Sequence, residues 1–211
     1  MLRCSGWLER NELVERTTAL DSYRTKRYHI LMHKHYDAIR QQYRPAHIRY
    51  LLIAESPPPS AETQSSRHFY RSEQVRTDDR LFVNTIKAIY PEAAEQTEKQ
   101  IEPDKEKWLR RLQQDGWYMI EALEVSQRHK VTKEERQEKI REALPRLIER
   151  IASLADKDTR IVLIKSNVFD VAAEPLRDAG FTVLNTELVD YPGRFNQRDY
   201  REKLADLTAS K

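Results

Sequence analysis

Glycine and cysteine are both scarce in this chain of 211 residues. Only four glycines occur and they are far apart, so the sequence has neither the glycine-rich turn of a dinucleotide-binding fold nor a P-loop. The single cysteine, Cys4, excludes an intramolecular disulfide framework, an all-cysteine zinc site and a four-cysteine iron–sulfur site. No serine lies in the glycine-flanked turn of a hydrolase nucleophile.

Long apolar runs are missing as well. The first ten residues, MLRCSGWLER, contain no apolar segment of signal-peptide length, and no run elsewhere approaches the length of a membrane span. Together with the lone cysteine, this favours a protein of the reducing cytoplasm. His29 and His33 have the i, i+4 spacing of a metal-binding pair, but no acidic residue or third ligand accompanies them. We therefore expect no metal, iron–sulfur cluster or other cofactor.

Charge, in contrast, is plentiful and nearly balanced. The chain has 37 lysines and arginines against 34 acidic residues, a net charge of +3, which permits nucleic-acid binding without requiring it. Residues 21–50 are unusual because they interleave basic and aromatic side chains with only two acids. Such a segment either binds a phosphate backbone and stacks on bases, or forms an amphipathic helix with a solvated basic face.

Apolar runs alternate with helical patterns along most of the chain. Continuous apolar runs predict buried strands at residues 50–55, 117–125, 160–167 and 181–189. Helices are predicted over residues 11–42, 80–90, 98–114, 133–154, 168–179 and 197–210, with a polar loop over 57–79. Pro145 is expected to split its helix, and Ser166 or Asn167 to cap the next one.

This alternation of strands and helices predicts a single α/β domain over residues 1–211. Its expected architecture is a three-layer α/β/α sandwich with a four-stranded, mainly parallel central sheet, and residues 1–45 form an appended helical arm. Ligands of such folds bind at the carboxyl ends of the strands. We therefore expect residues 55–59, 121–126, 165–167 and 190–195 to meet at one edge of the sheet.

These strand-end segments, in this order, resemble the motifs of the uracil-DNA glycosylase superfamily. The segment AESP, residues 54–57, resembles the first motif, which reads Gly-Glu-Ala-Pro in one class, with Glu55 and Pro57 matching. Glu121 stands where the second strand of the family ends in a base-reading asparagine. Tyr191 begins a Tyr-Pro-Gly segment where the last motif typically reads His-Pro-Ser. The resemblance covers roughly residues 50–207 and is consistent with the predicted four-stranded parallel sheet.

The resemblance implies a DNA-repair hydrolase that cleaves the N-glycosyl bond of a flipped, modified base in DNA. Glu55 would then position a water molecule beside the sugar, and Tyr191 would assist the departing base. The base would be bound by Glu121, by Phe69 or Tyr70 as the stacking aromatic, and by Ser56 and Pro57. The phosphates would be bound by Lys165, Ser166, Asn167, Gly193 and Arg194.

Three departures from the family pattern leave other interpretations open. Alanine replaces the leading glycine at position 54, glutamate replaces the asparagine at 121, and tyrosine replaces the histidine at 191. An ionised glutamate only accepts hydrogen bonds, so Glu121 favours a base with an exocyclic amine over uracil. Each residue also has a structural interpretation: Glu55 caps a nearby backbone or pairs with an arginine, Glu121 pairs with Lys165, and Tyr191 covers the pocket.

Two further functions therefore remain as alternatives. One is a non-catalytic nucleic-acid-binding protein that retains the fold, which the basic segment and the missing histidine favour. The other is a protein that binds a nucleotide or nucleoside in the same cleft, because the fold alone does not distinguish these ligands.

Overall fold

The computed structural model describes residues 36–58, 68–72, 79–127 and 131–209. The chain divides into two units, residues 1–38 and 39–211, and the second unit contains the elements described below. The expected helix over residues 11–42 lies mostly outside the described residues; its end is helical over residues 36–41. Most of the expected arm over residues 1–45 therefore also lies outside them.

The centre of the second unit is a sheet of four parallel strands in the order β2-β1-β3-β4. Its strands are β1 (Tyr50–Ala54), β2 (Trp117–Glu121), β3 (Arg160–Leu163) and β4 (Thr182–Val183). Leu52 lies opposite Met119 on one side and Val162 on the other. All five residues of β1 and of β2 are buried, which is why these runs are apolar up to the terminal Glu121 of β2 rather than alternating.

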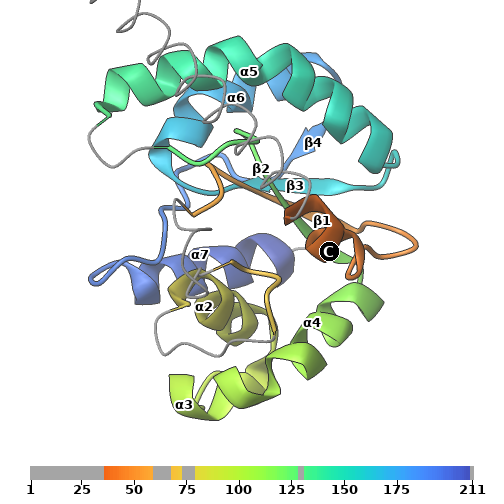
Figure 1. The fold of residues 1–211 in the computed structure, drawn as a ribbon, viewed down its shortest axis with the longest axis vertical. Coiled ribbons are helices and arrows are strands. Elements are labelled where there is room, and N and C mark those ends of the chain that lie inside the picture. The colour runs from red at the N-terminus through yellow and green to blue at the C-terminus, as the bar shows by residue number, and fades with distance from the viewer. Residues whose placement is uncertain (1–35, 59–67, 73–78, 128–130, 210–211) are drawn as a thin grey trace, which may run out of the picture. The chain divides into compact units, whose positions relative to one another are not determined.

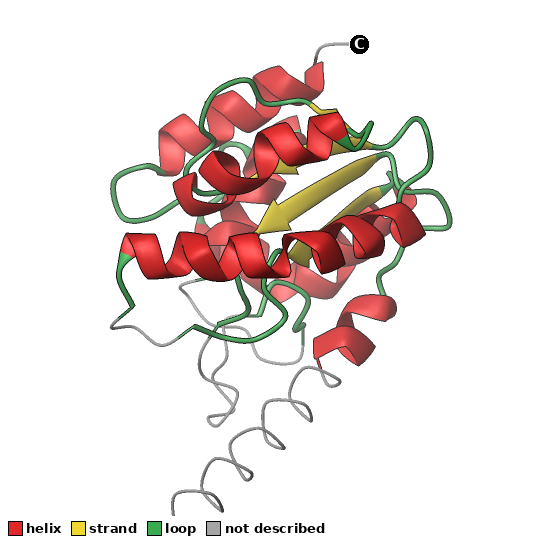
Figure 2. Cartoon of the chain, turned by 90° about the horizontal axis from the view of Figure 1, so that it is seen from above, coloured by secondary structure: helices red, strands yellow, loops and turns green. Residues whose placement is uncertain are grey.

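Helices cover both faces of this sheet, which confirms the predicted three-layer sandwich (Figures 1 and 2). On one face, α5 (Lys133–Leu154) packs against α6 (Ser166–Asp178). On the other face, α2 (Arg80–Ile89) packs against α7 (Gln197–Ala209), and α4 (Lys105–Gln114) contacts β2. The short elements are η1 (Pro91–Ala93), α3 (Glu98–Ile101) and η2 (Glu102–Asp104).

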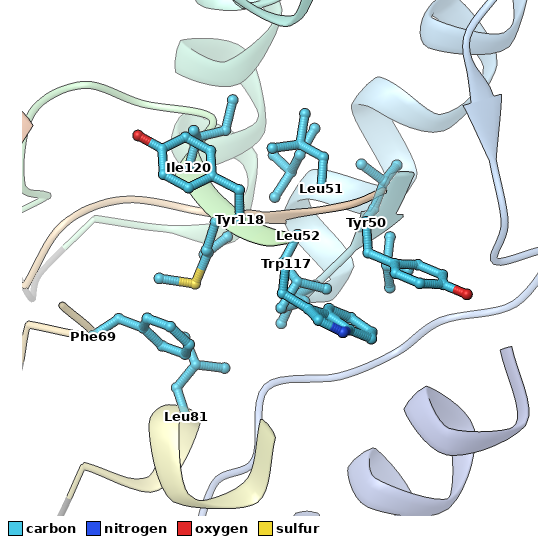
Figure 3. Close-up of a cluster of buried hydrophobic side chains, with 14 of the residues drawn as sticks. Tyr50, Leu51, Leu52, Phe69, Leu81, Trp117, Tyr118 and Ile120 are labelled. Atoms are coloured by element: carbon cyan, nitrogen blue, oxygen red, sulfur yellow. The ribbon is translucent and has the colours of Figure 1, made fainter. Parts of the chain in front are cut away.

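The core lies between these layers. Leu51, Leu52 and Ile120 are at most 1% exposed, and Figure 3 shows their side chains beside the central strands. At the amino ends of the strands, the Tyr50 ring stacks on Trp117, with centroids 4.3 Å apart and planes at 15°. Burying side chains of this size supplies most of the favourable free energy of folding.

Prolines act differently from expectation in two helices. The predicted helix over 98–114 is interrupted at η2, where Pro103 lacks the N–H that an α-helical turn needs. Pro145, in contrast, lies inside α5 without splitting it. Ile140 before the proline and Leu147 and Ile151 after it are all buried, so the same core holds both halves of this helix.

The fourth strand is shorter than predicted because a side chain takes over its hydrogen bonding. Ladder pairing ends at Val183, and one isolated bridge joins Ile164 to Val189. Between them, the fully buried Asn185 accepts a hydrogen bond from the Leu163 N–H at 3.0 Å and donates one to the Leu163 carbonyl at 3.1 Å. The asparagine amide thus occupies the position that a backbone peptide would have in a continuous strand.

Within the described part of the chain, no helix is both long and apolar enough to cross a membrane.

Candidate functional site

The carboxyl ends of β1 and β3 form the point at which the chain direction across the sheet reverses. From β1 the chain leaves toward α2 and reaches β2 on one side; from β3 it enters α6, on the opposite face, and reaches β4 on the other side (Figure 1). In open parallel sheets, ligands bind in the crevice that these diverging connections leave. The residues directly after β1 and β3 are therefore the best-placed candidates for a site.

Glu55 follows β1 and is the centre of a charged cluster at this point. It is 5% exposed. Its Oε1 accepts a hydrogen bond from Nη1 of Arg136 at 2.7 Å, and its Oε2 accepts from Nζ of Lys165 at 2.8 Å and from Nδ2 of Asn167 at 2.7 Å. Three of the predicted residues are thus brought together, and the expected alternative that Glu55 pairs with an arginine is confirmed.

The surroundings of Glu55 keep its carboxyl group ionised. Burial is the largest single influence and by itself raises the pKa, but the hydrogen bonds and charges of Lys165, Asn167 and Arg136 outweigh it. The resulting pKa of Glu55 lies below its ordinary value. At neutral pH the cluster therefore holds one carboxylate between two cations, with a net charge of +1.

Arg136 is the member of this cluster that sequence reasoning missed. It lies in the first turns of α5, the helix that follows β2. A helix that follows a parallel strand begins at the carboxyl edge of the sheet, so the residues in its first turns lie near the site. The sequence does indicate this placement. The capping box at Thr132 marks the start of a helix shortly after the strand that ends at Glu121, which puts Arg136 in the first turns of that helix.

Lys165 has a backbone conformation that is uncommon for a residue with a side chain. Its φ is +80°, and its N–H donates to the carbonyl of Val189 at 2.8 Å. The helix α6 begins directly after it at Ser166, so the prediction that Ser166 or Asn167 caps a helix starting at Val168 was wrong. Strained residues of this kind are concentrated at functional sites. At Lys165 the ion pair with Glu55 and the position before the first turn of α6 hold this conformation in place.

Glu121 lies at the end of β2 and is equally buried, at 5% exposure. Its Oε2 is paired with Nη1 of Arg40, and its Oε1 lies 3.9 Å from Nε2 of His68. Its backbone carbonyl accepts from Nη1 of Arg150 at 3.1 Å. The expected pairing of Glu121 with Lys165 was therefore wrong, because Lys165 binds Glu55 and an arginine from before β1 occupies the Glu121 carboxylate.

Phe69 and Tyr70 lie in the core rather than on the surface of a loop. They are 4% and 2% exposed, and Figure 3 shows Phe69 among the buried side chains. The Phe69 ring lies edge-on to Phe82, with centroids 5.5 Å apart. The Tyr70 hydroxyl accepts from the Met119 N–H at 2.6 Å and donates to the Met119 carbonyl at 3.3 Å. These bonds satisfy the outer backbone groups of β2, and burial raises the pKa of Tyr70 well above its ordinary value. As folded here, neither ring offers a face to a base.

The loops after β1 and β2 are joined to each other by hydrogen bonds. Pro57 is buried and Ser56 is half-buried. Ser126 Oγ donates to the carbonyl of Pro58 at 2.8 Å, and the N–H of Leu123 donates to the carbonyl of Glu55 at 2.9 Å. The proline segment is therefore tied to the neighbouring strand end, which holds Glu55 in one geometry.

The loop after Val189 presents aromatic and basic side chains to solvent. Tyr191 is 41% exposed, and its backbone is held by bonds from its N–H to Asp190 and from the Gly193 N–H to its carbonyl. Phe195 is 89% exposed, with the guanidinium carbon of Arg194 5.6 Å from its ring centroid. Sequence reasoning missed Phe195, because one phenylalanine in a polar loop carries no pattern.

Exposed large apolar side chains are confined to this edge of the sheet over the described residues. They are Val125, after β2, and Tyr191 and Phe195, in the loop that follows the bridge at Val189. No group of three or more histidine, cysteine, aspartate or glutamate side chains in the described ranges is arranged to hold a metal ion.

Comparisons of the chain with models of protein families, with curated proteins and with solved structures found no match.

Proposed function

We propose that the chain is a nucleic-acid-binding protein of the uracil-DNA glycosylase-like kind, which binds its ligand at the carboxyl edge of the sheet. The observation that carries this proposal is the loop over residues 190–195. Its Phe195 is 89% exposed, Arg194 lies against that ring, and Tyr191 is 41% exposed. Exposed aromatic rings beside cations are the combination that binds single-stranded or flipped bases together with their phosphates.

The charge at this edge supports the same ligand. The cluster around Glu55 has a net charge of +1, and the loop over residues 190–195 adds one exposed cation, Arg194, and one half-buried anion, Asp190. Neutralising phosphates in this way releases counterions, so binding should weaken steeply with salt. The net charge of the whole chain, +3, is small, so the local arrangement has to supply the affinity.

This proposal is tested by fluorescence anisotropy with a labelled single-stranded oligonucleotide at several salt concentrations. Base–aromatic stacking contributes about 1–3 kcal/mol per base, so Phe195→Ala should weaken binding by about 5- to 150-fold. Phe195→Leu, which stays apolar but cannot stack, should behave like the alanine variant. Arg194→Ala, which removes the cation beside Phe195, should also weaken binding. Its control is Lys157→Ala, which removes an exposed charge in the turn before β3 and should bind like the wild type.

Undetectable binding by the wild type, or binding that does not depend on salt, would contradict the proposal. Equal affinity of the wild type and Phe195→Ala would contradict the assignment of the loop.

N-glycosidic hydrolysis is a second candidate, and the ionised state of Glu55 favours it. A carboxylate that stabilises the developing positive charge of a sugar and orients water must be deprotonated at neutral pH. The carboxylate has about four acceptor positions, and its three hydrogen bonds leave one for a water molecule. In this mechanism Tyr191 would donate a hydrogen bond to the departing base.

Oligonucleotides that carry uracil, hypoxanthine, xanthine and alkylated bases test this candidate, with alkaline cleavage of abasic sites as the readout. If the protein is a hydrolase, the wild type should form product with at least one of these lesions, and Glu55→Gln should form none. Product formation that the glutamine variant retains would exclude Glu55 as a catalytic residue.

A further inference from the structure

A cavity lined by charged side chains lies at the opposite edge of the sheet from Glu55. Its volume is about 280 Å³, and it is lined by His47, Arg49, Tyr50, Asp158 and Arg160. Tyr50 and Arg160 are the first residues of β1 and β3, so the cavity opens where these strands begin. Glu55 and the loop over 190–195 lie at the ends of the strands, so the cavity is separate from the carboxyl-edge site.

The two arginines of this cavity are held in place by the sheet. The N–H of Arg160, the first residue of β3, donates to the carbonyl of Arg49, the residue directly before β1, at 2.9 Å. Their guanidinium carbons lie 6.0 Å (Arg49) and 5.8 Å (Arg160) from the centroid of the Tyr50 ring. Tyr50 is itself fixed by its stack on Trp117 and by a weak bond from its hydroxyl to the carbonyl of Thr208 at 3.4 Å.

A glycine makes room for one of these arginines. Gly116 has a φ of +82°, and its carbonyl accepts hydrogen bonds from the N–H groups of Arg49 and Tyr50. A Cβ atom at position 116 would lie 2.8 Å from Cγ of Arg49, closer than real Cβ contacts. The Arg49 side chain thus lies across the backbone of Gly116, which restricts its direction.

These two guanidinium groups have no carboxylate partner within 4.0 Å among the residues that the structure describes. The other charged residues nearby do not supply one: His47 is bound to Asp156 at 2.8 Å, and Asp158 lines the cavity without an ion pair to any described residue. Both guanidinium groups line the same cavity, so an anion bound there would be attracted by two positive charges. Planar guanidinium groups match the oxygens of phosphate particularly well.

We propose that this cavity binds a phosphomonoester group through Arg49 and Arg160. A phosphomonoester carries a charge of about −1.5 to −2 at neutral pH, which matches two guanidinium groups better than a carboxylate does. Asp158, on the wall of the same cavity, accepts hydrogen bonds from hydroxyl groups of the ligand. The volume of 280 Å³ lies just below the ~300–1,000 Å³ of drug-sized sites, so a small sugar phosphate suits it better than a dinucleotide.

Isothermal titration calorimetry with the full chain tests the proposal, with ribose 5-phosphate as the probe. Inorganic phosphate and ribose separate the contribution of the anion from that of the hydroxyl groups. We expect saturable binding of ribose 5-phosphate, weaker binding of phosphate and none of ribose. Oligonucleotides with and without a 5′-terminal phosphate distinguish a free metabolite from the end of a strand as the source of the group.

The variants Arg49→Gln and Arg160→Gln should each weaken ribose 5-phosphate binding at least tenfold, while Lys157→Gln leaves it unchanged. Arg160→Lys keeps the charge but loses the planar fork, so it should also bind more weakly. Circular-dichroism melts of each variant show whether it is folded. Absence of binding by the wild type, or equal binding by folded glutamine variants, overturns the proposal. Phe195→Ala should bind ribose 5-phosphate like the wild type, because Phe195 lies at the carboxyl edge of the sheet and the cavity lies at the amino edge. The phosphate-binding proposal is therefore tested independently of the nucleic-acid-binding proposal.

Discussion

Replacing Glu55 by glutamine removes the buried charge around which three donors are gathered. Glutamine has nearly the same shape, so the change leaves no cavity. Its amide oxygen still accepts up to two hydrogen bonds, but its NH₂ group must face either Arg136 or Lys165, and both of these side chains only donate. The variant therefore leaves Lys165 and Arg136 without their anion.

The size of the effect follows from burial. Removing one partner of a buried ion pair costs about 3–5 kcal/mol, and a hydrogen bond to a charged group contributes about 1.5–3 kcal/mol. The side chains of Lys165 and Arg136 are 35% and 17% exposed, so water compensates part of the loss. We expect the free energy of unfolding to fall by about 2–3 kcal/mol, and Tm by about 4–12 °C for a domain of this size.

The dependence on pH gives this prediction a second readout. The pKa of Glu55 is lower in the folded protein than its ordinary value of 4.5. A carboxyl group of this kind stabilises the fold fully above its unfolded pKa, and the contribution disappears as the pH falls through the folded pKa. The difference in free energy between wild type and variant should thus hold at neutral pH and shrink as the pH falls below 4.5.

Urea denaturation followed by far-UV circular dichroism measures both quantities. Glu149→Gln, at an exposed position of the same helix as Arg136, is the matched control and should change stability by less than about 0.5 kcal/mol. A Glu55→Gln variant as stable as the wild type at neutral pH would refute the reasoning. A destabilisation that persists unchanged at acidic pH would show that the lost charge is not its cause.

Two further substitutions test local features of the fold. Lys165→Gly and Lys165→Ala both remove the amine, but only glycine adopts a φ of +80° without strain, so the glycine variant should be more stable in urea by about 1–2 kcal/mol; equal stability would mean that the backbone there is relaxed. Asn185→Ala leaves the buried N–H and carbonyl of Leu163 without their partner and should lower the free energy of unfolding by about 2–3 kcal/mol. A change in thermal denaturation of less than about 1 °C would show that water replaces the amide.

The layer architecture could be predicted because it rests on patterns that are local in sequence. Strands buried on both faces must be almost wholly apolar, and the runs at residues 50–54 and 117–120 satisfy this condition, with the buried Glu121 at the end of the second run as the exception. The bounds of α5, Lys133–Leu154, agree with the prediction because a capping box begins the helix and apolar spacing continues through it.

Two predictions of helix and strand bounds were wrong because a tertiary contact outweighed the conformation that the local sequence favours. Pro145 disfavours a continuous helix locally, but the core on either side of it holds α5 together. The run over 181–189 has strand-like composition, yet the side chain of Asn185 takes the hydrogen bonds that β4 would otherwise make. Neither outcome is visible within a window of neighbouring residues.

The composition of the candidate site was predicted in part. Parallel topology brings strand ends to one edge, so Glu55, Lys165 and Asn167 were expected there, and the structure joins them directly. Phe69 or Tyr70 was expected beside a base because the family resemblance implies a stacking aromatic in this loop, but their burial depends on the core that they meet.

The sequence by itself determined the parallel sheet, its covering helices and the presence of two acids at strand ends, because periodicity and burial are properties of short segments. Only the tertiary structure decided the partners of those acids. Glu55 binds Arg136 and Glu121 binds Arg40, in each case across 81 residues of chain. An ion pair of this kind depends on distances of a few ångströms between segments whose approach is set by the packing of the whole domain.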